Sequence, residues 1–184
     1  MGGVTKSLRG QLLLSAGQLW DPNFRRTVVL IGHHDEEGAV GVVLNRASEV
    51  TVVDAAPALA ALVGADERVF LGGPVQPETA VVLAEFDQPE RAEIVAFGDV
   101  GFLPSESDHG SIGGIRRARM FAGYSGWGPG QLEGELEIDS WIVEPALAED
   151  VFTPTPERLW SDVLRRKGPE HELLRVMPFD PSSN

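Results

Sequence analysis

The chain has 184 residues, a formal net charge of −13 and no cysteine. This length is typical of a single domain that builds its own core. The missing cysteines exclude disulfides, thiolate nucleophiles and cysteine-ligated metals. Lysine and arginine number 15 against 28 acidic residues, which argues against direct nucleic-acid binding. No apolar run reaches the ~18 residues that cross a bilayer, so we expect a cytoplasmic protein without a membrane partner.

The first predicted unit is a β-hairpin. Residues 27–31 and 40–44 are apolar and rich in β-branched side chains, and the polar segment 33–38 between them ends in glycine. Because both runs are apolar at nearly every position, we expect both faces of the two strands to be covered.

The middle of the chain alternates irregularly between predicted helix and strand. A capping pattern at 51–54 predicts a helix that ends at Gly64, with Pro57 bending its first turn or moving its start. Residues 98–115 are rich in glycine and serine and predict a loop with at most a short helix. Further strands are predicted at 69–71, 80–86, 93–97 and 119–124.

Two helices are predicted after these strands. As a strand, the segment after Gly130 would place Glu133, Glu135 and Glu137 on one face, so we favour a helix with Glu133 near its positive end. A second helix follows Thr155 and ends before Gly168. Residues 178–184 are expected to form a loose tail. The irregular order of elements predicts an α+β fold.

No catalytic or metal-binding set is predicted. Ser125 lies in a segment close to the Gly-x-Ser-x-Gly nucleophile pattern, but the last glycine comes one position early. The histidines are His33, His34, His109 and His171, and none has metal-site spacing or an evident pairing with Ser125. A hydrolase that uses Ser125 with a histidine stays an alternative.

Glycine-rich turns and arginines form the candidate ligand site. A glycine loop before a helix offers N–H groups to an anion, and arginine binds carboxylate or phosphate through two hydrogen bonds. Neither the P-loop nor the dinucleotide fingerprint is present, and no cofactor is predicted. Tight-turn chemistry alone also accounts for these motifs. The candidate ligand-binding residues are Asn23, Arg25, Asn45, Arg46, Gly73, Gly126, Trp127, Gly128 and Gly130.

Four ordered segments carry a resemblance to a known family. They are residues 10–29, residues 36–46, residues 72–75, and residues 123–133 together with Trp141. In this order they resemble the YqgE/AlgH family of bacterial proteins. The resemblance implies one domain over residues 1–184, an α+β fold whose bent mixed or antiparallel sheet closes in part into a small barrel, and surrounding helices. The chain departs from the family pattern at Ala47, where proline is usual, and at Ser125, where alanine is usual.

The resemblance supplies a regulatory label but no catalytic residue. We therefore expect a non-enzymatic binding or regulatory module, acting in transcriptional regulation through a small anionic ligand or a protein partner. A direct DNA-binding regulator is the second alternative. Its basic patch would come from Arg116, Arg117 and Arg119 or from residues 165–167.

Overall fold

The computed structural model describes residues 6–16, 26–104 and 112–176. The strands are β1 (Gln11–Ser15), β2 (Val28–Asp35), β3 (Gly38–Val43), β4 (Ala47–Thr51), β5 (Arg68–Leu71), β6 (Val75–Phe86), β7 (Ile94–Phe97), β8 (Val100–Phe102), β9 (Ile115–Trp127) and β10 (Trp141–Pro145). The helices are α1 (Val52–Ala55), α2 (Ala60–Val63), α3 (Gln131–Glu137), α4 (Ala148–Val151), α5 (Leu159–Lys167) and α6 (Glu172–Val176). Short 3₁₀ turns are η1 (Pro57–Leu59), η2 (Pro89–Arg91), η4 (Pro156–Arg158) and η5 (Pro169–His171). Of the described helices, none has the length and apolarity to span a bilayer.

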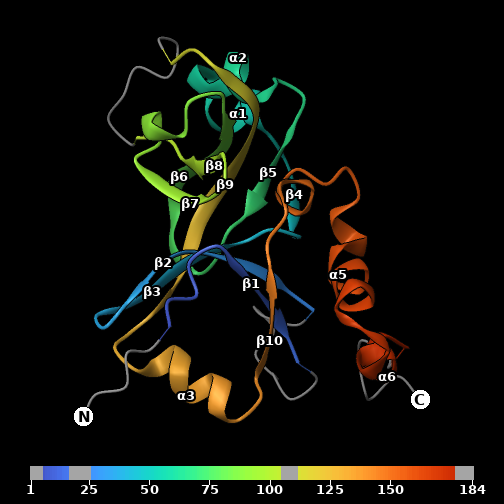
Figure 1. The fold of residues 1–184 in the computed structure, drawn as a ribbon. Helices are drawn as coiled ribbons and strands as arrows, with labels where there is room; N and C mark the ends of the chain where they lie inside the picture. Colours follow the sequence, from blue (N-terminus) through green and yellow to red (C-terminus); the bar gives the residue numbers. More distant parts are fainter. Residues whose placement is uncertain (1–5, 17–25, 105–111, 177–184) are drawn as a thin grey trace.

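The strands form one bent, mixed sheet in the order β10-β1-β2-β3-β9-β6-β8-β7. β5 attaches to β9 in parallel, and β4 attaches to β5. The long strand β9 joins the two halves, because its last residues pair with β3 and the rest pairs with β6 (Figure 1). The expected α+β class with a mixed sheet is therefore confirmed.

The expected partial closure into a barrel is wrong, because the sheet stays open. β10 and β7 lie at the two ends of the strand order, and no ladder joins them within the described chain. Instead the β7–β8 hairpin packs back on the other half through side chains. A Cβ placed on Gly32 of β2 would lie 2.8 Å from Cζ of Phe102, so this ring lies directly against the backbone of β2.

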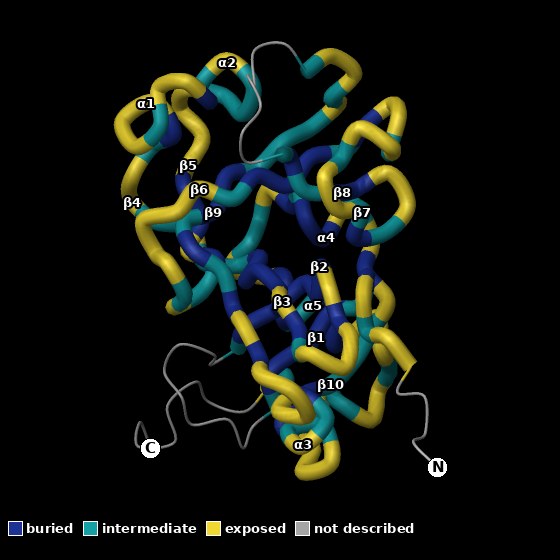
Figure 2. Tube along the Cα trace, turned by 90° about the vertical axis from the view of Figure 1, so that its left-hand side faces the viewer, coloured by how far each residue is buried: buried dark blue, intermediate teal, exposed yellow. Residues whose placement is uncertain are grey.

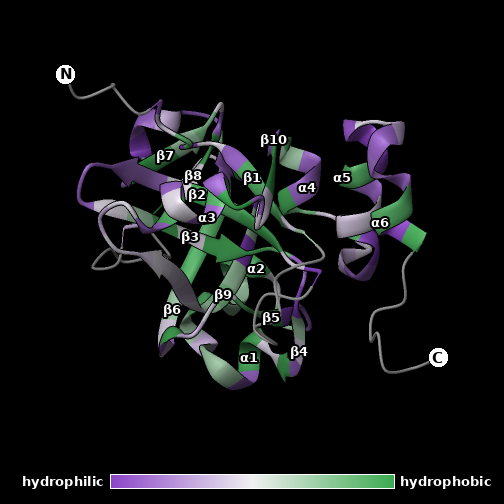
Figure 3. Cartoon of the chain, turned by 90° about the horizontal axis from the view of Figure 1, so that it is seen from below, coloured by the Kyte–Doolittle hydropathy of each residue, from purple (hydrophilic) through white to green (hydrophobic). Residues whose placement is uncertain are grey.

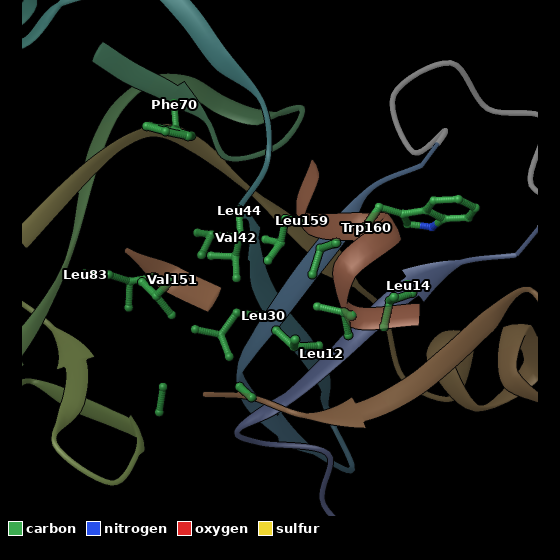
Figure 4. Packing of buried hydrophobic residues seen from close by; sticks show 14 of the residues in the cluster. Leu12, Leu14, Leu30, Val42, Leu44, Phe70, Leu83, Val151, Leu159 and Trp160 are labelled. Carbon is green, nitrogen blue, oxygen red and sulfur yellow. The ribbon is translucent and has the colours of Figure 1, made fainter. Parts of the chain in front are cut away.

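The predicted hairpin is present as β2 and β3, and both of its faces are covered. On one face Val28 and Leu30 pack against α5 in a core that also contains Leu12 and Trp160 (Figure 4). On the other face Val29 packs under α3. Figure 3 views the molecule from below and shows the mostly hydrophilic α3 in front of the hydrophobic strands β2 and β3.

Several elements differ from the prediction. Pro57 divides the helix predicted after residue 51 into α1, η1 and α2, and Gly64 ends it at a φ of +116°. The segment 98–115 contains β8, while its residues 105–111 lie outside the described chain. β1, β4, β10, α4 and α6 were not predicted. Figure 2 shows β1–β3 largely buried, α1 largely exposed, and α2 and α3 with a mixture of intermediate and exposed residues. The predicted tail, 178–184, is outside the described residues.

Candidate functional site

Asn45 and Arg46 follow β3 and belong to a turn. The Asn45 amide donates to the carbonyl of Arg26 (2.8 Å), and its oxygen accepts the N–H of Val28 (3.0 Å). The carbonyl of Arg46 accepts the N–H of Leu71 (2.8 Å). The Asn45 side chain thus holds the chain that enters β2. Asn23 and Arg25 lie outside the described residues.

Gly73 lies where two segments cross at van der Waals distance. A Cβ placed there would lie 2.5 Å from Oγ of Ser125. The Ser125 hydroxyl donates to the carbonyl of Gly72 (3.2 Å), and the residue is fully buried. No histidine of the described chain forms a hydrogen bond with it. Ser125 therefore fastens the crossing and is not exposed as a nucleophile.

The end of β9 and the loop 128–130 lead into α3, and the predicted helix is confirmed. The N–H of Gly128 donates to Oε1 of Gln131 (3.0 Å), so a side chain of the helix itself occupies this donor. Gly130 has a φ of +73°, which favours glycine at the start of the helix. The buried Trp127 packs edge-on against Trp141 with ring centroids 6.2 Å apart.

Two carboxylates of α3 fasten it to the sheet. Oε2 of Glu135 accepts both indole N–H groups, from Trp127 (2.9 Å) and Trp141 (2.7 Å). Oε1 of Glu133 lies 2.7 Å from Nε2 of His34, whose Nδ1 accepts the N–H of Leu8 (2.9 Å). The backbone N–H of Glu133, followed by His34, lowers the pKa of the Glu133 carboxyl. These acids hold the helix in place, which explains why acidic residues occur in a helix that covers a core.

Of the predicted ligand residues that the structure describes, Asn45 and Arg46 lie apart from Gly128 and Gly130. Gly38 at the start of β3 contacts Trp127 and Gly128, whereas Asn45 follows the other end of that strand. At ~3.3 Å per residue the two ends of the strand are about 17 Å apart. In Figure 1 α3 accordingly lies at the lower end, and β4, which follows Arg46, lies in the middle. Binding by either group alone stays a prediction.

A pocket of about 670 Å³ lies between β2–β3 and β6–β8. Its wall is mostly apolar and combines residues from six strands and a 3₁₀ turn. The apolar side chains include Val40, Val42, Leu59, Val81, Ile94 and Phe102. The polar side chains are His33, Gln76, Thr79, Glu93 and Tyr124.

Two backbone irregularities shape this pocket. The pairing of β2 with β3 shifts at Gly32, and the missing side chain there leaves room for the Phe102 ring. β6 leaves its ladder with β9 between Val75 and Ala80, and within this excursion Gln76 has a φ of +44°. Such backbone strain in a non-glycine residue is concentrated at functional sites.

The residues of this pocket were not singled out from the sequence. Tyr124 is the only tyrosine of the chain and lies in the glycine-rich segment, which is the one signal that pointed near the site. Phe102 lies in the segment that was predicted as a loop. Because the pocket depends on the β7–β8 hairpin folding back on β2, no local pattern indicates it.

Both predicted basic patches are engaged within the protein. Arg116 donates to Asp99 (2.8 Å), and Arg119 donates to the carbonyls of Val151 (3.0 Å) and Thr153 (2.9 Å). Burial lowers the pKa of Arg119. In the other patch Arg166 contacts both oxygens of Asp150 at 2.9 Å. Over the described ranges, no three His, Cys, Asp or Glu residues are grouped to hold a metal ion.

The chain is similar along its whole length to bacterial proteins. A UPF0301 protein of Streptomyces avermitilis is 43% identical over all of both chains, and one of Mycobacteroides abscessus is 41% identical over 95% of this chain and 87% of its own. The crystal structure of a Corynebacterium diphtheriae protein matches with a TM-score of 0.84 at 28% identity, covering 96% of this chain and 95% of its own. The solution structure of the AlgH protein of Pseudomonas aeruginosa matches with a TM-score of 0.73 at 26% identity, covering 97% and 98%. A family model described as AlgH-like matches residues 12–172, and the chain therefore belongs to the AlgH-like family.

Proposed function

We propose that the protein is a non-catalytic binding module whose ligand site is the pocket between β2–β3 and β6–β8. The observation that carries the proposal is a preformed pocket of about 670 Å³ with apolar walls and a few polar groups. This size and lining are typical of small-molecule sites. Two of its large apolar side chains, Val40 and Ile94, are 41% and 39% exposed, which leaves apolar surface for a ligand to cover.

The geometry of Ser125 favours binding over ester hydrolysis. A nucleophilic serine needs an accessible hydroxyl within hydrogen-bond reach of a base. The Ser125 hydroxyl is buried and donates to the Gly72 carbonyl instead. Chemistry at this residue would require the crossing of 72–73 with 123–125 to open.

A regulatory role would act through the ligand or a protein partner. Direct DNA binding needs arginines that can reach phosphates, and those of both predicted basic patches contact carboxylates or carbonyls of the protein. The excess of acidic residues also opposes approach to a duplex. Ligand occupancy would change the exposed apolar surface around Val40 and Ile94, where a protein partner could detect it.

The test is a calorimetric titration of the protein with 1-naphthylmethanol, a neutral apolar probe. Ala80→Phe fills the pocket from its exposed wall, and Ala61→Phe adds the same ring on α2, outside the pocket lining. The proposal predicts binding to the wild type and to Ala61→Phe, and at least a tenfold loss in Ala80→Phe. No binding to the wild type, or equal binding to both variants, would overturn it.

A further inference from the structure

The side chains that line the pocket do not balance positive and negative charge. Neither arginine nor lysine is among its lining residues. Its two ionisable charged side chains are Glu93, at the start of the β7–β8 hairpin, and His33 on β2. The sign of the field inside the pocket therefore depends on what each of these two contacts.

His33 already has an acidic partner. Its Nε2 lies 2.7 Å from Oδ2 of Asp35, two residues along the same strand. Hydrogen bonding from His33, and then from the N–H of Glu37, lowers the pKa of the Asp35 carboxyl, which stays ionised beside the imidazole. Any positive charge on His33 is thus balanced locally by Asp35.

Glu93 has no such balance. Its backbone N–H donates to the carbonyl of Phe102 (2.9 Å), which fixes the residue at the pocket wall. Glu93 is exposed at the rim of the pocket, and within the described residues no ion pair or hydrogen bond engages its carboxylate. The pocket therefore combines apolar walls with one uncompensated negative charge, in a chain whose net charge is −13.

Two aromatic rings add to this preference. Tyr124 and Phe102 both line the pocket, and the faces of aromatic rings attract cations. The Tyr124 hydroxyl has no hydrogen-bond partner among the described residues, so it can accept a hydrogen bond from a donor on the ligand.

We infer that the pocket selects a positively charged amphiphile, with an apolar body between Val40 and Ile94 and an ammonium-type head at Glu93. This inference rests on the proposed function and concerns a different site from the small anion expected at the glycine loops, because in this pocket an anion would face Glu93 without a cation to receive it. Glu93 would repel a carboxylate or phosphate group, even where the apolar walls of the pocket favour the rest of the ligand.

The test uses three probes that share one ring system: the cation 1-naphthylmethylammonium, the neutral 1-naphthylmethanol and the carboxylate 1-naphthaleneacetate. Dissociation constants are measured at low salt for the wild type, for Glu93→Gln and for Glu157→Gln. Glu157 is an exposed acid of η4 outside the pocket lining, so its variant makes the same change in net charge away from the site.

We expect the wild type to bind the ammonium probe at least about tenfold more tightly than the acetate probe. Glu93→Gln should lower this ratio at least about fivefold and leave the neutral probe unaffected, whereas Glu157→Gln should keep the ratio within about twofold. If the neutral probe binds and the acetate probe binds as tightly as the ammonium probe, the inference fails and the proposed function stands. If the ratio falls equally in Glu93→Gln and Glu157→Gln, the preference comes from the net charge of the protein and not from Glu93, and the inference is also overturned. If the neutral probe does not bind the wild type, the proposed function itself fails.

Discussion

Single carboxylates carry a large part of the contact between α3 and the sheet. Glu135 accepts hydrogen bonds from two buried indoles, Trp127 and Trp141. Glu135→Ala leaves both N–H groups without this acceptor, and we expect a loss of about 2–4 kcal/mol in the free energy of unfolding. Urea denaturation followed by tryptophan fluorescence measures it.

The matched control for this prediction lies in the same helix. Glu137→Ala removes an exposed carboxylate and should change the free energy of unfolding by less than about 0.5 kcal/mol. If both variants lose the same free energy of unfolding, the loss comes from a general change in the helix and not from the acceptor that the two indoles share.

Glu133 gives α3 a dependence on pH. Its own backbone N–H and then His34 lower the pKa of its carboxyl in the folded protein. A carboxyl whose pKa is lower in the folded than in the unfolded state stabilises the fold above the unfolded value, and loses that contribution as the pH falls through the folded value. Glu133→Gln should therefore flatten the fall in the free energy of unfolding below about pH 4.5. Identical slopes for variant and wild type between pH 4.5 and pH 3, measured by denaturant titration, would contradict this role.

At the scale of elements, one ion pair joins α5 to α4. Asp150 is buried, accepts the N–H of Leu147 (2.8 Å) and contacts Arg166 through both oxygens. This contact raises the pKa of Arg166. Arg166→Ala leaves a buried carboxylate without its cation and should lower the free energy of unfolding by about 2–4 kcal/mol.

The neighbouring arginine supplies the control for Arg166. Among the described residues Arg165 bonds only Asp162 (3.2 Å) on its own helix, and a solvent-exposed pair of this kind contributes about 0–1 kcal/mol. In thermal denaturation, the melting temperature of Arg166→Ala should therefore be clearly lower than that of Arg165→Ala. Equal melting temperatures would refute the assignment of the inter-helix contact to Arg166.

The contact of Gly32 with Phe102 holds the two halves of the sheet around the pocket. Gly32→Ala places a methyl group against the ring and should cost about 1–3 kcal/mol through overpacking. Phe102→Leu in the same chain relieves the clash, so the double variant should lose less than the sum of the two single variants. Additive losses in a double-mutant cycle would show that the two positions are not in contact.

The same elements show what the sequence could predict. The β2–β3 hairpin and α5 are dense in local signals, namely two apolar runs around a polar turn and an apolar stripe between a threonine and a glycine. β1, β8 and β10 are short and exist because of distant partners, such as Ser15 pairing with Trp141. Asn45 and Gly73 were predicted as ligand residues, with tight-turn chemistry as the alternative, and the contacts that the structure shows for them are internal.

At the scale of the whole molecule, the pocket lies where segments far apart in the sequence meet. Gly32 and Phe102 are 70 positions apart, and only the fold-back of the β7–β8 hairpin brings them together. The net charge of −13 was visible in the composition, but its meaning for a ligand depends on where charges are balanced. The arginines of the predicted basic patches contact carboxylates or carbonyls of the protein, whereas no such partner engages the Glu93 carboxylate within the described residues.

The single tyrosine makes the central claim directly measurable. Incorporation of 3-fluorotyrosine labels only Tyr124, which lines the pocket, so the protein gives one ¹⁹F resonance. Titration with 1-naphthylmethanol should shift this resonance saturably in the wild type and in Ala61→Phe, but not in Ala80→Phe. A resonance that stays unmoved in the wild type while the probe binds would place the ligand elsewhere and contradict the assignment of this pocket as the functional site.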